Sequence, residues 1–171
     1  DMRNTSKMTT LENKFPLLAV EHGCIISKDA DITVAFEVEL PELYTVTGAE
    51  YEAIHGCWCK AIKVLPYFCV VHKQDWFIKE KYMPELQKDD MSFLSRSFER
   101  HFNERPYLKH SCYLYLTKTT KERNRMQSNF STLCRGHIIP KELDKETAGK
   151  FMEAAEQFER IMNDSGFVRL R

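Results

Sequence analysis

The sequence has no long apolar run and no excess of charge. Its longest nearly apolar stretch, residues 64–71, is interrupted by Pro66. That stretch is far shorter than the roughly 20 residues that a membrane-spanning helix needs. The 25 Lys and Arg residues equal the 25 Asp and Glu residues, so the formal net charge is zero. These two absences exclude a transmembrane helix from this sequence and argue against a general polyanion-binding protein.

A phosphate-binding loop is also missing. The pattern G-x-x-x-x-G-K-[ST] needs glycines that let backbone amides approach the phosphates, and a Lys that neutralises them. The only Gly-Lys pair is Gly149-Lys150, with Phe151 after it and Asp144 where the first glycine should stand. The sequence therefore excludes nucleotide hydrolysis by this chain, and we expect no cofactor.

The cysteines and histidines form no paired metal-binding motif. His55 and Cys59 would share one face of a helix, and Cys134 and His137 have C-x-x-H spacing, but neither pair has a second pair to complete a site. No local signature marks a Cys–His nucleophile pair. We therefore expect no metal ligand, no catalytic residue and free cytosolic thiols. The six cysteines are Cys24, Cys57, Cys59, Cys69, Cys112 and Cys134.

What the sequence does contain is a clear strand pattern in residues 31–40, where polar and apolar residues alternate. Successive side chains of a strand point to opposite faces. One face, predicted to be buried, holds Ile32, Val34, Phe36, Val38 and Leu40. The other face holds Thr33, Glu37 and Glu39. Burial of one face only is typical of an antiparallel sheet.

Four further segments are interpreted as strands. Residues 15–27 form one strand, and a turn at residues 27–30 reverses the chain into the next strand as a hairpin. Residues 67–71 are apolar throughout and are predicted to form a central strand. Residues 76–78 add a short strand or a loop, and residues 108–117 alternate as a strand.

Three helices are expected, each with a capping residue and an apolar stripe. Thr47 with Glu50 forms a capping box for the first helix, Asp89 or Asp90 can cap the second, and Asp144 can cap the third. The stripes, in chain order, are Tyr51, Ile54, Trp58, Ile62 and Leu65; then Met91, Leu94, Phe98 and Phe102; then Phe151, Ala155, Phe158 and Met162.

This order of elements predicts an α+β fold. We expect an antiparallel sheet with helices packed on one face, a two-layer sandwich that is loosely ferredoxin-like. Residues 1–14 are expected to be a flexible leader, and residues 15–171 a single α+β domain. Because residues 167–170 start a new strand-like pattern, we also expect this domain to have been truncated from a longer protein.

Charge is distributed unevenly along the chain. Residues 1–65 hold six basic and ten acidic residues, whereas residues 96–135 hold nine basic and three acidic residues. A local patch of one sign can bind a partner even in a neutral chain. The basic region is centred on a predicted loop at residues 118–130, which could contact nucleic acid, anionic lipid head groups or an acidic partner. The flanking Tyr113, Tyr115 and Phe130 could stack on bases.

Several segments resemble a known family. They are residues 13–18 with 21–27, residues 51–55 with 65–66, and residues 98–106 with 113–116. Through them the chain resembles the N-terminal region of the TraG family of bacterial conjugative transposons, which are conjugation ATPases that energise type IV secretion channels. The likeness runs from about residue 8 to residue 170.

The resemblance implies a non-catalytic role in DNA transfer. It implies an N-terminal assembly or docking domain, whose motor domain lies elsewhere in the parent ATPase. The expected partners are inner-membrane components of the conjugation apparatus, with self-association of the full-length protein. The expected location is cytoplasmic, peripherally associated with the inner membrane. The family's catalytic residues lie outside these 171 positions.

Two functions from different classes follow. The first is the assembly domain, for which we single out two candidate surfaces of opposite charge. One is the polar sheet face with Glu37 and Glu39, and the other is the basic region with Lys118, Lys121, Arg123 and Arg125. The second is a nucleic-acid-binding module that uses the basic region 96–135.

Overall fold

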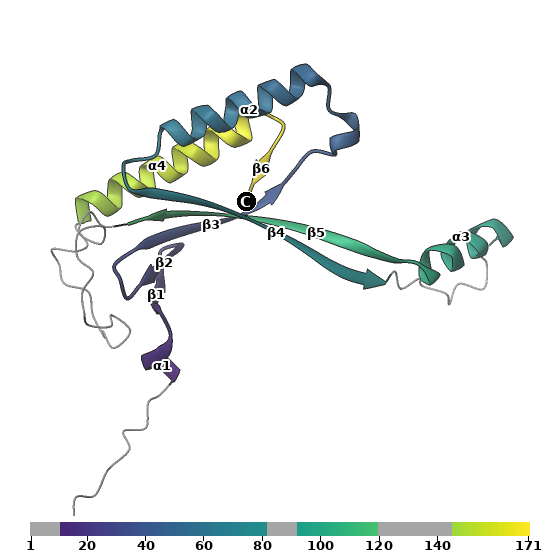
Figure 1. Ribbon diagram of the computed structural model, residues 1–171, viewed down its shortest axis with the longest axis horizontal. Coiled ribbons are helices and arrows are strands. Elements are labelled where there is room, and N and C mark those ends of the chain that lie inside the picture. Colours follow the sequence, from purple (N-terminus) through teal and green to yellow (C-terminus); the bar gives the residue numbers. More distant parts are fainter. Residues whose placement is uncertain (1–10, 82–91, 120–144) are drawn as a thin grey trace, which may run out of the picture.

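A computed structural model describes residues 11–81, 92–119 and 145–171. The fold is α+β, with an antiparallel six-stranded sheet and helices on one face, which confirms the predicted class (Figure 1). In chain order the elements are α1 (Leu11–Lys14), β1 (Leu17–Glu21), β2 (Cys24–Ser27), β3 (Ile32–Glu39), the 3₁₀ turn η1 (Leu43–Thr45), α2 (Gly48–Lys63), β4 (Cys69–Lys81), α3 (Phe93–Glu104), β5 (Pro106–Lys118), α4 (Lys145–Asp164) and β6 (Arg169–Leu170).

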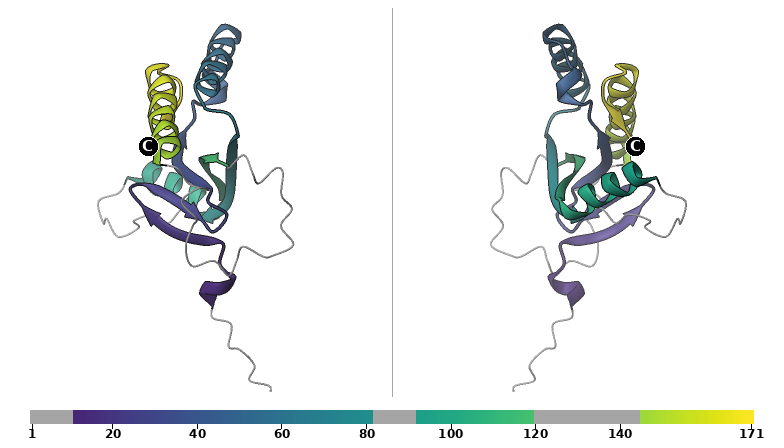
Figure 2. Two further views of the ribbon diagram at one scale, coloured as in Figure 1. Left: turned by 90° about the vertical axis from the view of Figure 1, so that its left-hand side faces the viewer. Right: turned by 90° about the vertical axis from the view of Figure 1, so that its right-hand side faces the viewer.

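The central sheet has the β-α-β-β-α-β connectivity of ferredoxin-like folds. β3, α2, β4, β5, α4 and β6 supply it, and its strands lie in the order β4-β5-β3-β6, all antiparallel. β1 and β2 are added as a hairpin beside the start of β3. α3 is an insertion between β4 and β5. Figure 2 shows α2 and α4 standing together on one side of the sheet.

The core lies between the sheet and α4. The alternation in β3 is confirmed, since Ile32, Val34, Phe36 and Val38 are all buried, but Leu40 lies past the end of the strand and is exposed. β5 adds its own buried residues to the same face, because it pairs in register with β3. The fully buried large side chains are Phe151, Phe158, Leu114, Leu116 and Met162. The predicted stripe of the last helix is thus confirmed.

The capping box of α2 is also confirmed. The Thr47 hydroxyl accepts from the Glu50 backbone N–H at 3.3 Å, and the Glu50 carboxylate accepts from the Thr47 backbone N–H at 2.8 Å. The predicted stripe is only partly right, because Tyr51 and Ile62 are exposed. Ala61 is the fully buried residue of α2, since α2 packs against α4 as well as the sheet and a small side chain permits close approach.

The prediction of one strand over residues 15–27 is wrong. Two strands, β1 and β2, form a hairpin there, joined by the two residues His22 and Gly23. Both have positive φ, 52° and 75°, which is the backbone of a type I′ turn. Gly23 adopts that conformation without strain, and this explains why the chain reverses inside an apolar stretch. The turn that follows β2 was predicted correctly.

The prediction that residues 67–71 form a central strand is wrong. β4 runs over residues 69–81, absorbs the predicted short segment at 76–78, and occupies an edge of the sheet, where it pairs only with β5. The central strands are β3 and β5. Much of β4 is exposed, which fits the charged side chains of Lys73, Asp75 and Lys79 on it.

The most distinctive feature of the molecule is a projecting arm. β3 pairs with β5 only from Cys112 to Lys118, whereas β4 pairs with β5 as far as Pro106. Residues 76–81 and 106–111 therefore continue beyond the sheet as a two-stranded ribbon, and α3 is joined to its end (Figure 1). We call these residues together with α3 the arm. No helix in the described part of the chain has both the length and the apolar character of a membrane crossing.

Candidate interaction surface on the arm

α3 is built by local signals rather than by packing on the core. Ser92 is its N-cap, and the Ser92 hydroxyl accepts from the Ser95 backbone N–H at 3.2 Å. The prediction that Asp89 or Asp90 caps this helix is therefore wrong. The helix ends at Arg105, which is extended because a residue before proline avoids the helical conformation. β5 then starts at Pro106, so the helix and strand meet in a sharp corner.

The apolar stripe of α3 is exposed on the surface. Phe98 and Phe102 are one turn apart, and their ring centroids are 4.5 Å from each other. Leu94 is 79% exposed, Phe98 64% and Phe102 45%. In Figure 1, α3 lies far from the layer formed by α2 and α4. The stripe was identified from the sequence, but its position on the surface was not.

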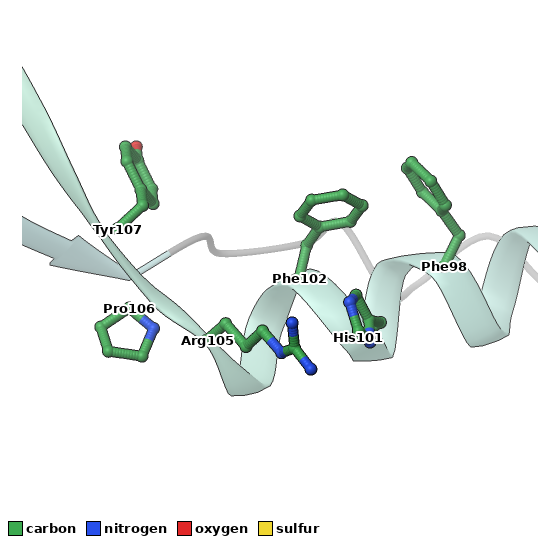
Figure 3. A pocket seen from close by; sticks show the side chains of 6 residues that line it. All are labelled: Phe98, His101, Phe102, Arg105, Pro106 and Tyr107. Carbon is green, nitrogen blue, oxygen red and sulfur yellow. The ribbon is translucent and has the colours of Figure 1, made fainter.

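The corner between α3 and β5 holds a pocket of about 500 Å³. Its lining residues are Phe98, His101, Phe102, Arg105, Pro106 and Tyr107. Figure 3 shows the Phe98, Phe102 and Tyr107 rings pointing to the same side, with Arg105 at the junction of helix and strand. The Tyr107 hydroxyl donates to the Glu80 carboxylate at 3.1 Å, which ties this ring to the neighbouring strand. The pocket therefore combines an aromatic wall with the guanidinium of Arg105.

A charged cluster stands at the base of the arm. Asp75 forms an ion pair with Lys73 and a hydrogen bond with His110, whose Nε2 lies 2.8 Å from Asp75 Oδ1. Hydrogen bonds from Lys73 and then from His110 lower the pKa of Asp75 from 3.8 to about 2. Asp75 pairs with the buried Cys112, so these side chains lie on the same face of the sheet as the core residues of β5. The cluster marks the point where the buried core ends and the arm begins.

Cys112 lies beside this cluster but is poorly suited to act as a nucleophile. Its side chain is buried, and burial raises the pKa of its thiol. A nucleophilic cysteine needs a lowered pKa and access to substrate. Burial also raises the pKa values of Cys24 and Cys69. The five cysteines of the described ranges are all free thiols.

The predicted His55–Cys59 neighbourhood exists. The Cys59 sulfur and His55 Nε2 are 3.8 Å apart on the exposed side of α2. Across the described ranges, no three His, Cys, Asp or Glu side chains gather closely enough to hold a metal ion. Cys134 and His137 fall outside those ranges.

The acidic pair predicted as one contact surface is found on the sheet face away from the helices. Glu37 is exposed, and its backbone exchanges hydrogen bonds with Arg171 at 3.0 Å in both directions. The Glu39 carboxylate lies 2.7 Å from the Arg171 guanidinium. Both side chains therefore lie where β3 meets the end of the described chain. Their role in contacts stays a prediction.

The basic region is only partly described. Lys118 lies on the opposite sheet face from Glu37, and its Nζ donates to the Thr119 carbonyl at 3.0 Å and stands 5.5 Å from the centre of the Phe68 ring. Lys121, Arg123 and Arg125 fall outside the described residues. The described basic residues of region 96–135 are spread over α3 and both faces of β5, namely Arg96, Arg100, Arg105, Lys109 and Lys118.

Comparison with known proteins adds one partial match. A family model described as "Domain of unknown function, B. Theta Gene description" (DUF3875) matches residues 4–56. The matched segment includes β1 to β3 and the first part of α2. The arm lies outside it. A search of curated proteins found no match.

Proposed function

We propose that this chain is a non-catalytic docking domain of a conjugative transfer ATPase, and that it attaches the ATPase to the transfer apparatus through the arm. The apparatus and the ATPase come from the sequence resemblance. The arm is the part of the described structure that best supports a docking role. The expected partners are inner-membrane components of the apparatus, and the expected position is the cytoplasmic side of that membrane.

The observation that carries this proposal is the exposed apolar stripe of α3. Soluble proteins rarely keep contiguous large apolar side chains in water, and such patches commonly mark interaction sites. Leu94, Phe98 and Phe102 form such a patch at the end of a ribbon that extends away from the core. An arm of this kind reaches a partner while the core stays at a distance.

The structural design of the arm fits a contact role. Its two strands are held by a continuous register from Trp76↔Ser111 to Lys81↔Pro106. Cross-strand contacts stiffen it, including Lys109 with Glu80 at 3.4 Å and Tyr107 with the same carboxylate. A stiff arm presents its end in one orientation, which lowers the entropy cost of binding.

The experiment that tests this function uses the full-length ATPase in cells that carry the transfer apparatus. Phe98→Gln with Phe102→Gln makes the stripe polar and keeps good helix formers. We expect DNA transfer to fall at least tenfold and the protein to leave the membrane fraction, with ATP hydrolysis by the purified protein unchanged. Tyr44→Gln with Tyr51→Gln is the matched control, because it removes two exposed aromatic rings that lie off the arm.

Normal transfer by the Phe98→Gln, Phe102→Gln protein would contradict the proposed role of the arm. ATP hydrolysis by the 171-residue chain itself would contradict a non-catalytic domain. Capture of an identified inner-membrane component by the wild-type chain, but not by the stripe variant, would support the proposal directly.

Nucleic-acid binding through region 96–135 stays the second prediction. A salt titration of single-stranded DNA binding tests it, because neutralised phosphates release counterions and give a steep log–log slope. If that reading holds, Lys121→Ala with Arg123→Ala abolishes the binding. Absence of binding at low salt removes this alternative.

A further inference from the structure

We infer that the end of the arm binds an anionic lipid surface, with the α3 stripe entering the interface and the basic residues of the arm contacting headgroup phosphates. This inference rests on the proposed docking function and names the partner of the same surface. Three features of the described residues support it.

The first feature is the amphipathic character of α3. Its exposed apolar side chains are Phe93 at its start and Leu94, Phe98 and Phe102 along one stripe, and the other residues of the helix are polar or charged. A helix with a strongly apolar stripe and a charged opposite side lies in the plane of a membrane interface. Leu108, early in β5, is also an exposed apolar residue of the arm.

The second feature is the charge of the arm. Residues 76–81 and 92–111 contain six Lys or Arg residues and three Glu residues, in a chain whose net charge is zero. The arm is thus the positive part of the described molecule. The cytoplasmic surface of a bilayer that contains anionic lipid attracts each Lys or Arg near it by about 1 kcal/mol. The charge of the arm therefore complements that surface.

The third feature is the pocket at the corner. Phe98, Phe102 and Tyr107 give it an aromatic wall, and Arg105 and His101 are also among its lining residues. An anionic phospholipid has matching chemistry, since its phosphate pairs with a guanidinium and its acyl chain packs on aromatic rings. An uncharged apolar ligand would pack on the rings but leave the Arg105 guanidinium without an anionic partner.

The direct test is vesicle co-sedimentation of the 171-residue chain. The vesicles are phosphatidylglycerol with phosphatidylcholine in equal parts, compared with phosphatidylcholine alone. We expect at least tenfold tighter binding to the anionic vesicles. We expect Phe98→Gln with Phe102→Gln to weaken that binding at least tenfold, and Arg105→Gln to weaken it on anionic vesicles only. Tyr44→Gln with Tyr51→Gln again serves as the control and should bind like the wild type.

A second measurement asks whether the stripe enters the acyl region. Phe102→Trp in a chain that also carries Trp58→Phe and Trp76→Phe places a lone tryptophan on the stripe. Acyl-brominated lipids should quench its fluorescence in anionic vesicles. Far-ultraviolet circular dichroism of each variant checks that it is folded. The co-sedimentation test uses the native tryptophans and does not depend on this variant.

The outcomes separate lipid from other occupants. No binding to anionic vesicles at low salt overturns the inference, and so does binding that the stripe variant retains in full. A concentration-dependent oligomer that the stripe variant abolishes, without vesicle binding, would assign the stripe to a second copy of the chain instead. The proposed docking function survives each of these results if transfer still needs the stripe, so the two proposals fail separately.

Discussion

Phe77 stacks on His110 across the two strands of the arm, with ring centroids 4.6 Å apart and ring planes only 7° from parallel. The same imidazole has its Nε2 2.8 Å from Asp75 Oδ1. His110 is thus held by an aromatic face and by a carboxylate at the base of the arm.

Asp75→Asn should remove part of the acid sensitivity of the protein. The folded-state pKa of Asp75, about 2, is below its ordinary value of 3.8. The carboxylate therefore contributes stability above about pH 4, and that contribution is lost as the pH falls towards 2. Because these contacts are partly exposed, we expect the contribution to be less than about 1 kcal/mol. Urea titrations at pH 5 and pH 2.5 should show a smaller pH effect in Asp75→Asn.

The control for this result is Glu153→Gln, which removes an exposed carboxylate on α4. It should leave the difference between the two pH values as large as in the wild type. An unchanged pH effect in Asp75→Asn would show that the cluster does not stabilise the fold.

Ser92→Ala should loosen α3 without unfolding the molecule. The Ser92 side chain caps the helix, and an N-cap serine contributes about 1 kcal/mol to helix stability. Since α3 projects from the core, this loss should stay local. Hydrogen exchange of the amides from Phe98 to Phe102 should accelerate several-fold, while the melting temperature changes little. Ser97→Ala, inside the same helix, should not accelerate exchange.

Phe158→Ala should be among the most damaging single substitutions. Phe158 is fully buried and meets Trp58 edge to face, with 6.3 Å between the ring centroids. Truncation of a buried phenylalanine costs about 3–5 kcal/mol, because it leaves a cavity. Phe98→Ala, on the exposed stripe, should cost less than about 1 kcal/mol. Urea unfolding of both variants, followed by circular dichroism, measures the difference. Equal losses would mean that α3 packs into the core in solution.

Replacing glycine by alanine should have opposite effects on stability inside α4 and just after its end. Gly166 follows α4 with φ of 73°, a conformation that costs an alanine about 1–2 kcal/mol. Gly149 lies inside α4, and an added Cβ there would meet open space. Gly149→Ala should therefore stabilise the protein by about 0.5–1 kcal/mol. Thermal melts of the two variants should shift in opposite directions.

The sequence predicted what local chemistry determines. The alternation in residues 32–39 could be interpreted because one face of β3 is buried by a single helical layer. The Thr47–Glu50 capping box could be identified because all its hydrogen bonds lie within four residues. Phe158 and its neighbours on α4 could be assigned to the core because a 20-residue helix gives a long periodic signal.

The sequence could not show which distant segment, if any, packs on a given apolar face. Residues 67–71 are apolar, yet β4 is an edge strand, because strand order depends on contacts between distant segments. Phe98 and Phe102 mark an apolar stripe of α3 in the same way as Phe151 and Phe158 mark one of α4. Only the placement of α3 on the arm separates a surface stripe from a core stripe.

One local signal was missed that could have been found. The pair His22-Gly23 supplies a glycine at the second position of a two-residue turn. Apolar residues before and after this turn made the two strands look like one.

β5 is a single unbroken strand, with one half in the arm and the other half at the centre of the sheet. A force that draws the outer end of β5 along its own axis would load all seven residue pairs between β5 and β3 simultaneously. Hydrogen bonds sheared together resist far better than bonds opened one after another. Under the proposed docking function, this pairing would let the sheet bear tension along the arm, which an attachment between the ATPase and a fixed support requires.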